Sequence, residues 1–358
     1  MNARNGVHRH KIWIGILIVL FILGFAFGFV YYRMTAANSS KKTVQAFVVE
    51  EGSGTSQIAA ELESKGLIRS ANGFKIYARI HKMDGKFQAG TYNLSPSMKV
   101  SEIANIIEGG KVAAVSVTIT EGMNEFEIAQ LLAKKGLVDK DKFIDAAENT
   151  DFSKEFPFLK NAQKGKYRLE GYLYPETYSI PEGSSEEDII RIMLKQFQKV
   201  YQSLSIKKKA AKMGYSVNEI MTVASIVEKE SGNKKDRPTV ASVIYNRLKE
   251  PMKLQMDSTV NYALITNGKT ITGATSYKDL EEDSPYNTYR VDGLPPGPIC
   301  SPGKSSIEAA LDPDDTDYLY FVLSEKLDGT SYFTDNYEDF MKAANAYGEA
   351  SRAEESKG

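Results

Sequence analysis

The sequence predicts an α+β protein with a single membrane-spanning helix near its N-terminus, a repeated strand–helix–helix–strand region, and an α+β domain after it. Three observations support this fold class. Residues 12–32 form an uncharged apolar run, residues 50–68 recur seventy positions later without a gap, and short β-branched runs alternate with segments whose apolar residues are spaced by three and four. At 358 residues, the chain is long enough for about two globular domains.

The apolar run IWIGILIVLFILGFAFGFVYY contains no charged residue over residues 12–32. This length crosses a hydrocarbon core of about 30 Å at about 1.5 Å per residue. A cleaved signal peptide has a shorter apolar core and a small-residue cleavage site, so an uncleaved anchor is favoured, although TAA at 35–37 keeps cleavage open. We therefore predict a cytoplasmic tail at 1–11, a transmembrane helix at 12–32 and a linker at 33–42, while the flanking basic residues decide the orientation only weakly.

Composition excludes several classes of protein. Cys300 is the only cysteine, so the fold has no intramolecular disulfide. The chain has 45 basic and 46 acidic residues and a formal net charge of −1, without the basic excess that drives nucleic-acid binding. We therefore expect no nucleic-acid partner.

An internal repeat organises the first half of the chain. The segment EEGSGTSQIAAELESKGLI, residues 50–68, aligns with TEGMNEFEIAQLLAKKGLV, residues 120–138, and a second block at 90–107 matches one at 176–193. Each copy predicts a strand, two helices, a strand and a third helix, with Gly66 and Gly136 where helices end. We assign the first repeat unit to residues 43–110 and the second to residues 111–200.

A strand–helix–helix–strand unit on an exported protein resembles the LysM module. That resemblance implies binding of glycans that contain N-acetylglucosamine. The alternative is a duplicated scaffold that positions the next domain. Because no residue pattern for sugar binding is visible in the repeats, the scaffold is slightly favoured and both interpretations stay open.

The second half is best interpreted by elimination. The three histidines are His8, His10 and His81, so no imidazole follows residue 81. This excludes a Ser-His-Asp triad, a Cys-His pair at Cys300 and a histidine-rich zinc site in the C-terminal domain. Neither a phosphate-binding P-loop nor a G-x-G-x-x-G motif occurs. The S-x-x-K match at Ser301 contains Pro-Gly, which is unsuited to a helix interior. We expect neither a metal nor a cofactor.

Carboxylates remain, and the segment SVNEIMTVASIVEKESG at 216–232 is the best place for one. Ser216 and Glu219 form a predicted capping box, and the uncharged residues 220–227 predict a helix buried on all sides. Glu228 and Glu230 follow, with Gly232 as the expected helix end. A partly desolvated carboxyl has a raised pKa, as a general acid requires. Taken alone, the segment favours the other interpretation, two exposed glutamates on a last helical turn.

Four blocks of the chain resemble the endolytic murein transglycosylases of the MltG (YceG-like) family. They are LEGYLYPETY at 169–178, ASIVEKES at 224–231, the polar segment 237–264, and the proline-rich loop 284–313 with DYLYFV after it. The resemblance runs from the apolar N-terminal segment to about Tyr347. Ser258 and Ser301 depart from residues that are common in the family, which puts local loop geometry in doubt.

This resemblance implies an enzyme that cuts nascent peptidoglycan between N-acetylmuramic acid and N-acetylglucosamine and helps to end glycan elongation beside penicillin-binding protein synthases. It implies that Glu230 is catalytic and that Glu228 is a supporting carboxylate, and the reverse assignment stays open. A lytic transglycosylase uses the muramyl C6 hydroxyl as its nucleophile, so one carboxyl suffices, whereas hydrolysing glycosidases ordinarily need two.

The remaining expectations complete the prediction for a catalytic domain at 201–350. Seven residues are expected to bind substrate, and Asp257 would be the second carboxylate of a muramidase-type hydrolase: Gln255, Asp257, Thr259, Tyr286, Asn287, Thr288 and Tyr289. Asp328-Gly329 predicts a hairpin that completes the sheet, and residues 351–358 are expected to be disordered. The location would be the cell membrane, with the catalytic domain on the extracytoplasmic side. A non-catalytic peptidoglycan-binding scaffold for cell-wall synthases is the competing interpretation.

Overall fold

The computed structural model describes Phe21, Gly24 and residues 35–37, 44–110, 114–271, 273 and 275–355. The predicted membrane-spanning segment 12–32 lies outside these residues apart from Phe21 and Gly24. Within the described ranges, no helix is both long enough and apolar enough to span a bilayer. The chain divides into two compact units, one of residues 1–115 with 179–183 and the other of residues 116–178 with 184–358.

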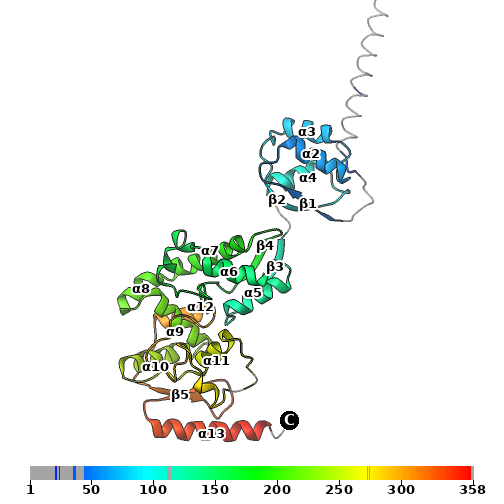
Figure 1. The fold of residues 1–358 in the computed structure, drawn as a ribbon. Coiled ribbons are helices and arrows are strands. Elements are labelled where there is room, and N and C mark those ends of the chain that lie inside the picture. The colour runs from blue at the N-terminus through cyan, green and yellow to red at the C-terminus, as the bar shows by residue number, and fades with distance from the viewer. Residues whose placement is uncertain are drawn as a thin grey trace, which may run out of the picture. The chain divides into compact units, whose positions relative to one another are not determined.

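The first unit has the predicted order of elements (Figure 1). The elements are β1 (Gln45–Val49), α2 (Thr55–Ser64), α3 (Ala71–Ile80), β2 (Gly90–Leu94) and α4 (Val100–Glu108). The two strands are antiparallel, with Phe47 opposite Tyr92. Because side chains alternate along a strand, both rings reach the same face, and they are fully buried with Leu62 and Phe74 from the helices. The predicted strand–helix–helix–strand–helix unit is confirmed here.

The second repeat unit has the same order with an insertion. It comprises β3 (Ala114–Thr118), α5 (Glu125–Lys134), α6 (Lys140–Asn149), the 3₁₀ turns η1 (Phe152–Lys154) and η2 (Pro157–Asn161), β4 (Thr177–Pro181) and α7 (Glu186–Ser203). Strands β3 and β4 pair with each other. Gly66 and Gly136 follow α2 and α5 with φ of 69° and 72°, so the predicted helix ends are confirmed.

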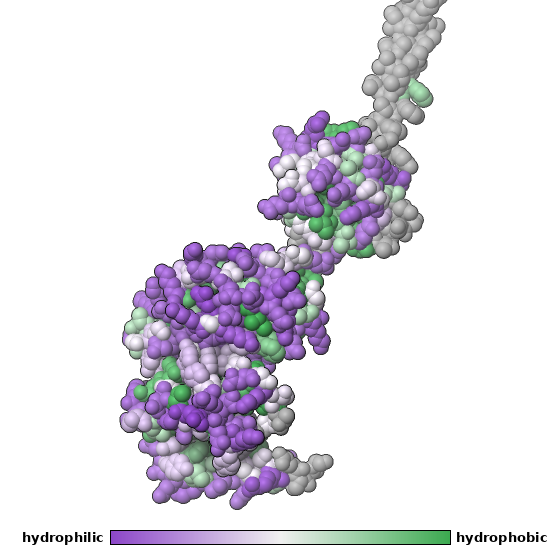
Figure 2. Space-filling view, in the orientation of Figure 1, coloured by the Kyte–Doolittle hydropathy of each residue, from purple (hydrophilic) through white to green (hydrophobic). Residues whose placement is uncertain are grey.

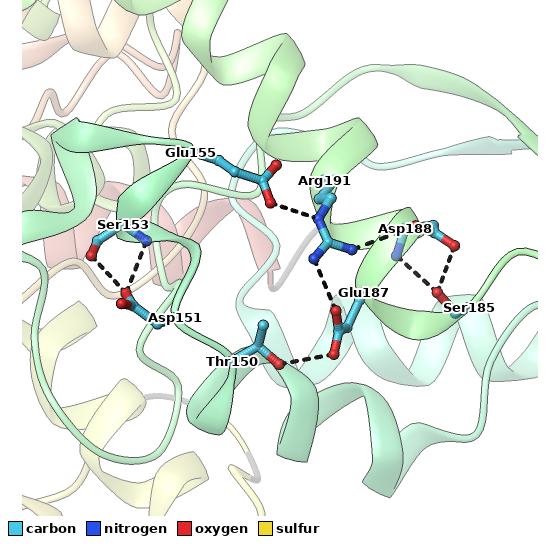
Figure 3. A network of polar contacts seen from close by, with 8 residues as sticks. All are labelled: Thr150, Asp151, Ser153, Glu155, Ser185, Glu187, Asp188 and Arg191. Atoms are coloured by element: carbon cyan, nitrogen blue, oxygen red, sulfur yellow. Dashed lines mark hydrogen bonds and ion pairs between the residues drawn. The ribbon is translucent and has the colours of Figure 1, made fainter.

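Arg191 fastens the insertion to α7 (Figure 3). Its guanidinium pairs with Glu155 of the insertion at 3.1 Å and with Glu187, one turn earlier on α7, at 2.9 Å. Glu187 in turn accepts a hydrogen bond from Thr150 at the end of α6. The guanidinium also lies 5.4 Å from the ring centre of Phe152. The insertion is therefore an ordered part of the second unit.

The rest of the second unit is built around α9. The elements are α8 (Ile206–Met213), α9 (Val217–Glu230), α10 (Arg237–Lys249), α11 (Asp257–Thr266), η3 (Asp279–Glu281), α12 (Lys304–Leu311), β5 (Tyr320–Leu323), β6 (Ser331–Thr334) and α13 (Tyr337–Glu355). Residues 220–227 of α9 are all buried, and the Ser216–Glu219 capping box is present. Both predictions are confirmed. The visible face of the described residues is mainly hydrophilic (Figure 2). The apolar residues of α9 are buried and form part of the internal core.

Three local expectations need correction. The hairpin β5–β6 around Asp328-Gly329 is present but forms its own two-stranded sheet. Helix α13 continues to Glu355, so the expected disorder of 351–358 is wrong for residues 351–355, where Ala and Glu favour a helix. Helix α9 ends at Glu230, the capping residue Ser231 has φ of −118°, and Gly232 does not adopt the left-handed conformation of a helix-ending glycine. The Ser231 hydroxyl donates to the Asn233 carbonyl at 2.8 Å directly after this helix end.

Candidate active site

The last turn of α9 sends Glu228 and Glu230 to different surroundings. Side chains two residues apart on a helix point in widely different directions. Glu228 faces α10 and α12, and its side chain is 6% exposed. Glu230 faces the start of α11 and lines two pockets of the second unit. The two carboxyls are therefore available for different tasks.

Both carboxylate oxygens of Glu228 accept hydrogen bonds from other parts of the protein. The Arg237 guanidinium donates to both of its carboxylate oxygens, at 2.8 and 3.3 Å. The Gly303 amide and the Ser306 hydroxyl donate to Oε2 at 2.9 and 2.7 Å. These charge-assisted and neutral hydrogen bonds tie the end of α9 to α10 and α12.

Glu230 has far weaker support. Within the part of the chain that the structure describes, its one hydrogen bond is accepted by Oε1 from the Ser258 amide at 3.3 Å. Burial raises the pKa of Glu230, and the nearby Asp257 charge raises it further, while the contacts with Ser258 and the charge of Arg247 oppose the shift. Desolvation is the largest of these causes. Glu230 therefore holds a proton to a higher pH than an ordinary glutamate, as a general acid must.

Glu230 lies between two pockets. The first, here called the Asn124 pocket, has a volume of about 350 Å³. It is lined by Asn124, Glu127, Lys229, Glu230, Asp257, Ser258, Asn261, Tyr262, Ile265, Ile271 and Ile299. The second, here called the aromatic pocket, has a volume of about 360 Å³. It is lined by Glu230, Arg247, Gln255, Met256, Asp257, Tyr289, Tyr320, Phe321, Tyr337 and Phe340. A chain-like ligand that occupied both would pass Glu230 and Asp257.

Three of the seven predicted substrate-binding residues line these pockets. Gln255 and Asp257 are exposed at the start of α11, and Tyr289 is partly buried beside them. The Tyr289 hydroxyl donates to Asp257 Oδ1 at 2.6 Å. Gln255 has φ of 50°, a left-handed backbone conformation that is uncommon for a side-chain-bearing residue and often marks a functional site.

The other four lie behind the pockets. Thr259, Asn287 and Thr288 are all 0% exposed. The hydroxyls of Thr259 and Thr288 are 2.8 Å apart, and Thr288 Oγ1 accepts from the Met256 amide. The Asn287 amide donates to the carbonyls of Leu280 and Glu282. The Tyr286 ring lies 4.8 Å from that of Tyr262, and its hydroxyl contacts Gln163. These four residues contact other parts of the protein, and none of them lines either of the two pockets beside Glu230.

Several pocket residues were absent from the sequence prediction. Asn124 caps the start of α5 in the second repeat unit, Glu127 lies in its first turn, and Arg247 comes from α10. Arg247 donates to the carbonyls of Leu319 and Leu254, both at 2.6 Å, and burial lowers its pKa. Asn246 and Arg247 are polar residues near the end of a largely apolar helix, and this pattern in the sequence could have indicated them. Nothing local to Asn124 indicates that it lines a pocket with Glu230.

Backbone pairing explains why the second repeat reaches the pocket. The Gly122 amide donates to the Ser301 carbonyl, and the Ser301 amide donates to the Met123 carbonyl. Next to them, Cys300 is buried against the Ser225 carbonyl of α9. The loop at 298–303 thus joins the start of α5 to α9.

Among the described residues, no group of three or more His, Cys, Asp or Glu side chains is placed to hold a metal ion.

Comparison with known proteins gives concordant matches. The model of the YceG-like family matches residues 47–346. The endolytic murein transglycosylase of Bacillus subtilis is 38% identical over 339 residues, which cover 91% of each chain. That of Streptococcus pneumoniae R6 is 32% identical over 90% of this chain and 62% of its own length. A crystal structure of a putative YceG-like protein from Listeria monocytogenes is 38% identical, with a TM-score of 0.57 over 84% of this chain and 99% of that one.

Proposed function

The chain belongs to the YceG-like family, and we propose that it cleaves peptidoglycan glycan strands as a lytic transglycosylase with Glu230 as general acid and base. The observation that carries the assignment is the contrast at the end of α9. Glu228 is saturated by Arg237, Gly303 and Ser306, whereas Glu230 lies between two pockets with its pKa raised by burial. Murein transglycosylation is the function that the relatives of this chain carry in their names.

One carboxyl accounts for the whole reaction. Protonated Glu230 donates its proton to the oxygen that links muramyl C1 to the next N-acetylglucosamine, and the C1–O bond breaks. The resulting carboxylate then accepts the proton of the muramyl C6 hydroxyl as O6 bonds to C1 and closes the 1,6-anhydro ring. Glu230 is protonated again at the end, and no water is consumed. A raised pKa suits the first step.

The two pockets supply sites for sugars on either side of the cleaved bond. We assign ring stacking to Tyr289 and Tyr320 in the aromatic pocket, since tyrosine offers an apolar face and a polar tip. Gln255 and Asp257 would hydrogen-bond sugar hydroxyl or acetamido groups, since both line the aromatic pocket. Thr259, Asn287 and Thr288 then act as positioning residues that hold the start of α11, and Tyr286 supports Tyr262.

A second candidate reaction is hydrolysis. Asp257 lines both pockets beside Glu230 and is exposed, so it is the residue that would activate water in a muramidase-type enzyme. The Tyr289 hydroxyl, which donates to Asp257, orients that carboxylate. Hydrolysis leaves a reducing end on the product, whereas transglycosylation leaves an anhydro end.

The finer placement of the enzyme belongs to the same proposal. The apolar segment 12–32 would anchor the protein in the cell membrane, with the two compact units on the extracytoplasmic side where nascent strands form. Penicillin-binding protein synthases would be its neighbours. These assignments draw on the N-terminal sequence and on the family.

Mass spectrometry of the products tests the proposal. Full-length protein would be incubated with uncrosslinked glycan strands, beside Glu230→Gln and Glu228→Gln. We expect products lighter by one water than hydrolysis products, and a loss of rate by about 10²–10⁴-fold in Glu230→Gln with the fold retained. Glu228→Gln should instead lower the free energy of unfolding by about 3–5 kcal/mol, because Arg237 loses its buried partner.

The outcomes separate the candidates. Products with a reducing end that depend on Asp257 would favour hydrolysis. Anhydro products formed by Glu230→Gln at the wild-type rate would remove Glu230 from the chemistry and return attention to Glu228. An absence of products from correctly folded wild-type protein would favour a glycan-binding scaffold.

A further inference from the structure

Two glutamates outside the proposed chemistry are buried together beside the active site. Glu125 begins α5 and is 0% exposed, and Glu170 lies in the turn at 167–172 and is 1% exposed. Neither takes part in an ion pair within the described part of the chain. An ionised carboxylate buried without a cation is among the most costly groups in a protein interior.

Hydrogen bonds join the pair to a wall of the Asn124 pocket. The Glu125 amide donates to both carboxylate oxygens of Glu170 at 3.1 Å, and the Leu169 amide donates to Glu125 Oε2 at 3.0 Å. The Tyr262 hydroxyl donates to Glu170 Oε2 at 3.0 Å. Tyr262 belongs to α11 and lines the pocket that contains Glu230. Three segments that are distant in the sequence therefore meet at Glu170.

Close packing leaves Glu170 little room to move. The next residue, Gly171, has φ of 84°, and a Cβ atom there would lie 2.5 Å from the Pro298 side chain. Pro298 is followed by Ile299, which lines the same pocket as Tyr262. A displacement of Glu170 would therefore shift two walls of the Asn124 pocket.

The surroundings favour the uncharged form of the pair. Burial raises the pKa of Glu170 to about 8. Burial, and then the neighbouring Glu170, raise the pKa of Glu125 well above its usual value. Glu125 Oε1 is buried and has no hydrogen-bond partner among the described residues. Among the described residues, the titratable groups with the largest interactions with the pair or its neighbours include Glu127, Glu148, Tyr262, Tyr286 and Cys300, none of which is cationic. Lys229 lines the Asn124 pocket but forms no ion pair with Glu125 or Glu170 in the described part of the chain.

We propose that Glu170, supported by Glu125, is a positioning residue of the active site that holds Tyr262 and the adjoining pocket wall in place while the pair is uncharged. Its effect on glycan cleavage rests on the proposed function. Ionisation puts charge on a buried pair that has no ion-pair partner among the described residues, and it loosens the junction between the start of α5, the turn at 167–172 and α11. The enzyme thus acquires an alkaline limit that Glu230 does not set.

Steady-state kinetics across pH 6–10 test the proposal with the full-length protein. The set comprises wild type, Glu170→Gln, Tyr262→Phe and, as the matched neutralisation of an exposed glutamate, Glu349→Gln. We expect wild-type kcat/KM to fall about fivefold between pH 8 and 9 and about tenfold between pH 9 and 10, since the protonated fraction of a group with a pKa of about 8 falls by these factors. Glu170→Gln should move this alkaline limb upward by at least about one pH unit, and Tyr262→Phe should raise KM more than it lowers kcat. Identical alkaline limbs in wild type and Glu170→Gln overturn the proposal, as does an equal shift in Glu349→Gln.

Hydrogen exchange gives a readout that does not need catalysis. It would be measured for amides 257–266 of α11 in the Glu230→Gln background, with rates corrected for intrinsic pH dependence. We expect protection to fall by about tenfold between pH 7 and 9, and the fall to vanish when Glu170→Gln is added. Protection that is constant over this range overturns the positioning role even if glycan cleavage is established. If protection falls as expected but the wild-type protein cleaves no glycan, the result counts against the proposed function alone.

Discussion

The two repeat units share a fold but differ where their first helices begin. Ile58 and Ile128, and likewise Leu62 and Leu132, occupy equivalent positions and are buried in both copies. At the helix start, Gly54, Thr55 and Gln57 of the first copy correspond to Asn124, Glu125 and Glu127 of the second. The apolar positions thus maintain the module, whereas the polar positions at one helix end give it a role.

Local structure follows these substitutions. Helix α2 begins at Gly54 without a side-chain cap, whereas α5 begins with a capping box in which Asn124 and Glu127 bond each other's backbone amides. The same two residues line the Asn124 pocket, and Glu125 between them is buried against Glu170. The second copy therefore supplies a wall of the proposed active site.

The largest expected difference between the two compact units is in how their thermal unfolding transitions depend on pH. Glu125, Glu170 and Glu230 have raised pKa values in the second unit, so they bind protons in the folded state that the unfolded chain releases above about pH 4.5. This contribution is fully present below that pH and is lost as pH rises toward about 8, the pKa of Glu170. We expect the calorimetric transition of the second unit to move down by many degrees between pH 5 and 8, and less so in Glu170→Gln. A transition that does not respond to this variant would contradict the assignment of buried, uncharged carboxyls.

Equivalent core truncations in the two units should affect glycan cleavage differently. Leu62→Ala and Leu132→Ala each remove a fully buried side chain at the same repeat position, at a cost of about 2–5 kcal/mol. We expect Leu132→Ala to lower the melting temperature of the second unit and, with it, the temperature at which glycan cleavage is lost. Leu62→Ala should lower only the transition of the first unit. Equal losses of heat resistance in the cleavage assay would show that catalysis depends on both copies alike.

Changes to the residues that cap α2 and α5 should have the smallest effect on the free energy of unfolding. Asn124→Ala removes a side chain that accepts from the Glu127 amide at 2.8 Å, and it should cost about 1 kcal/mol in urea unfolding of the second unit. In the first unit, Gly54→Asn adds a cap where none exists and should gain a few tenths of a kcal/mol. A loss of stability in Gly54→Asn would mean that the two helix starts are not equivalent in backbone geometry.

The sequence predicted the elements better than the contacts between them. Apolar spacing located the helices of both repeats, and the uncharged run at 220–227 correctly indicated a buried α9, because periodicity reports which face of an element is covered. It does not report which distant segment covers it. Nothing near Asn124 announces the pairing of Gly122 with Ser301 that brings it beside Glu230.

Side-chain chemistry was equally ambiguous for the predicted sugar contacts. The hydroxyls of Thr259 and Thr288 suit a sugar as well as they suit each other, and only the fold shows that they meet at 2.8 Å in the interior. Asp257 and Gln255, from the same stretch of sequence, lie at the pocket. The roles of Glu230 and Glu228 remain predictions that the mass-spectrometric comparison addresses.

The most direct test of the contrast between the repeats exchanges their polar residues. One variant gives the second copy the residues of the first, Asn124→Gly with Glu127→Gln, and its mirror gives the first copy Gly54→Asn with Gln57→Glu. The measurement is kcat/KM for release of anhydro-ended products from uncrosslinked glycan strands. We expect a loss of about tenfold or more in the first variant, roughly the value of one or two hydrogen bonds, and less than about twofold in the mirror. Equal values for the two variants would contradict the conclusion that the second repeat forms a wall of the active site.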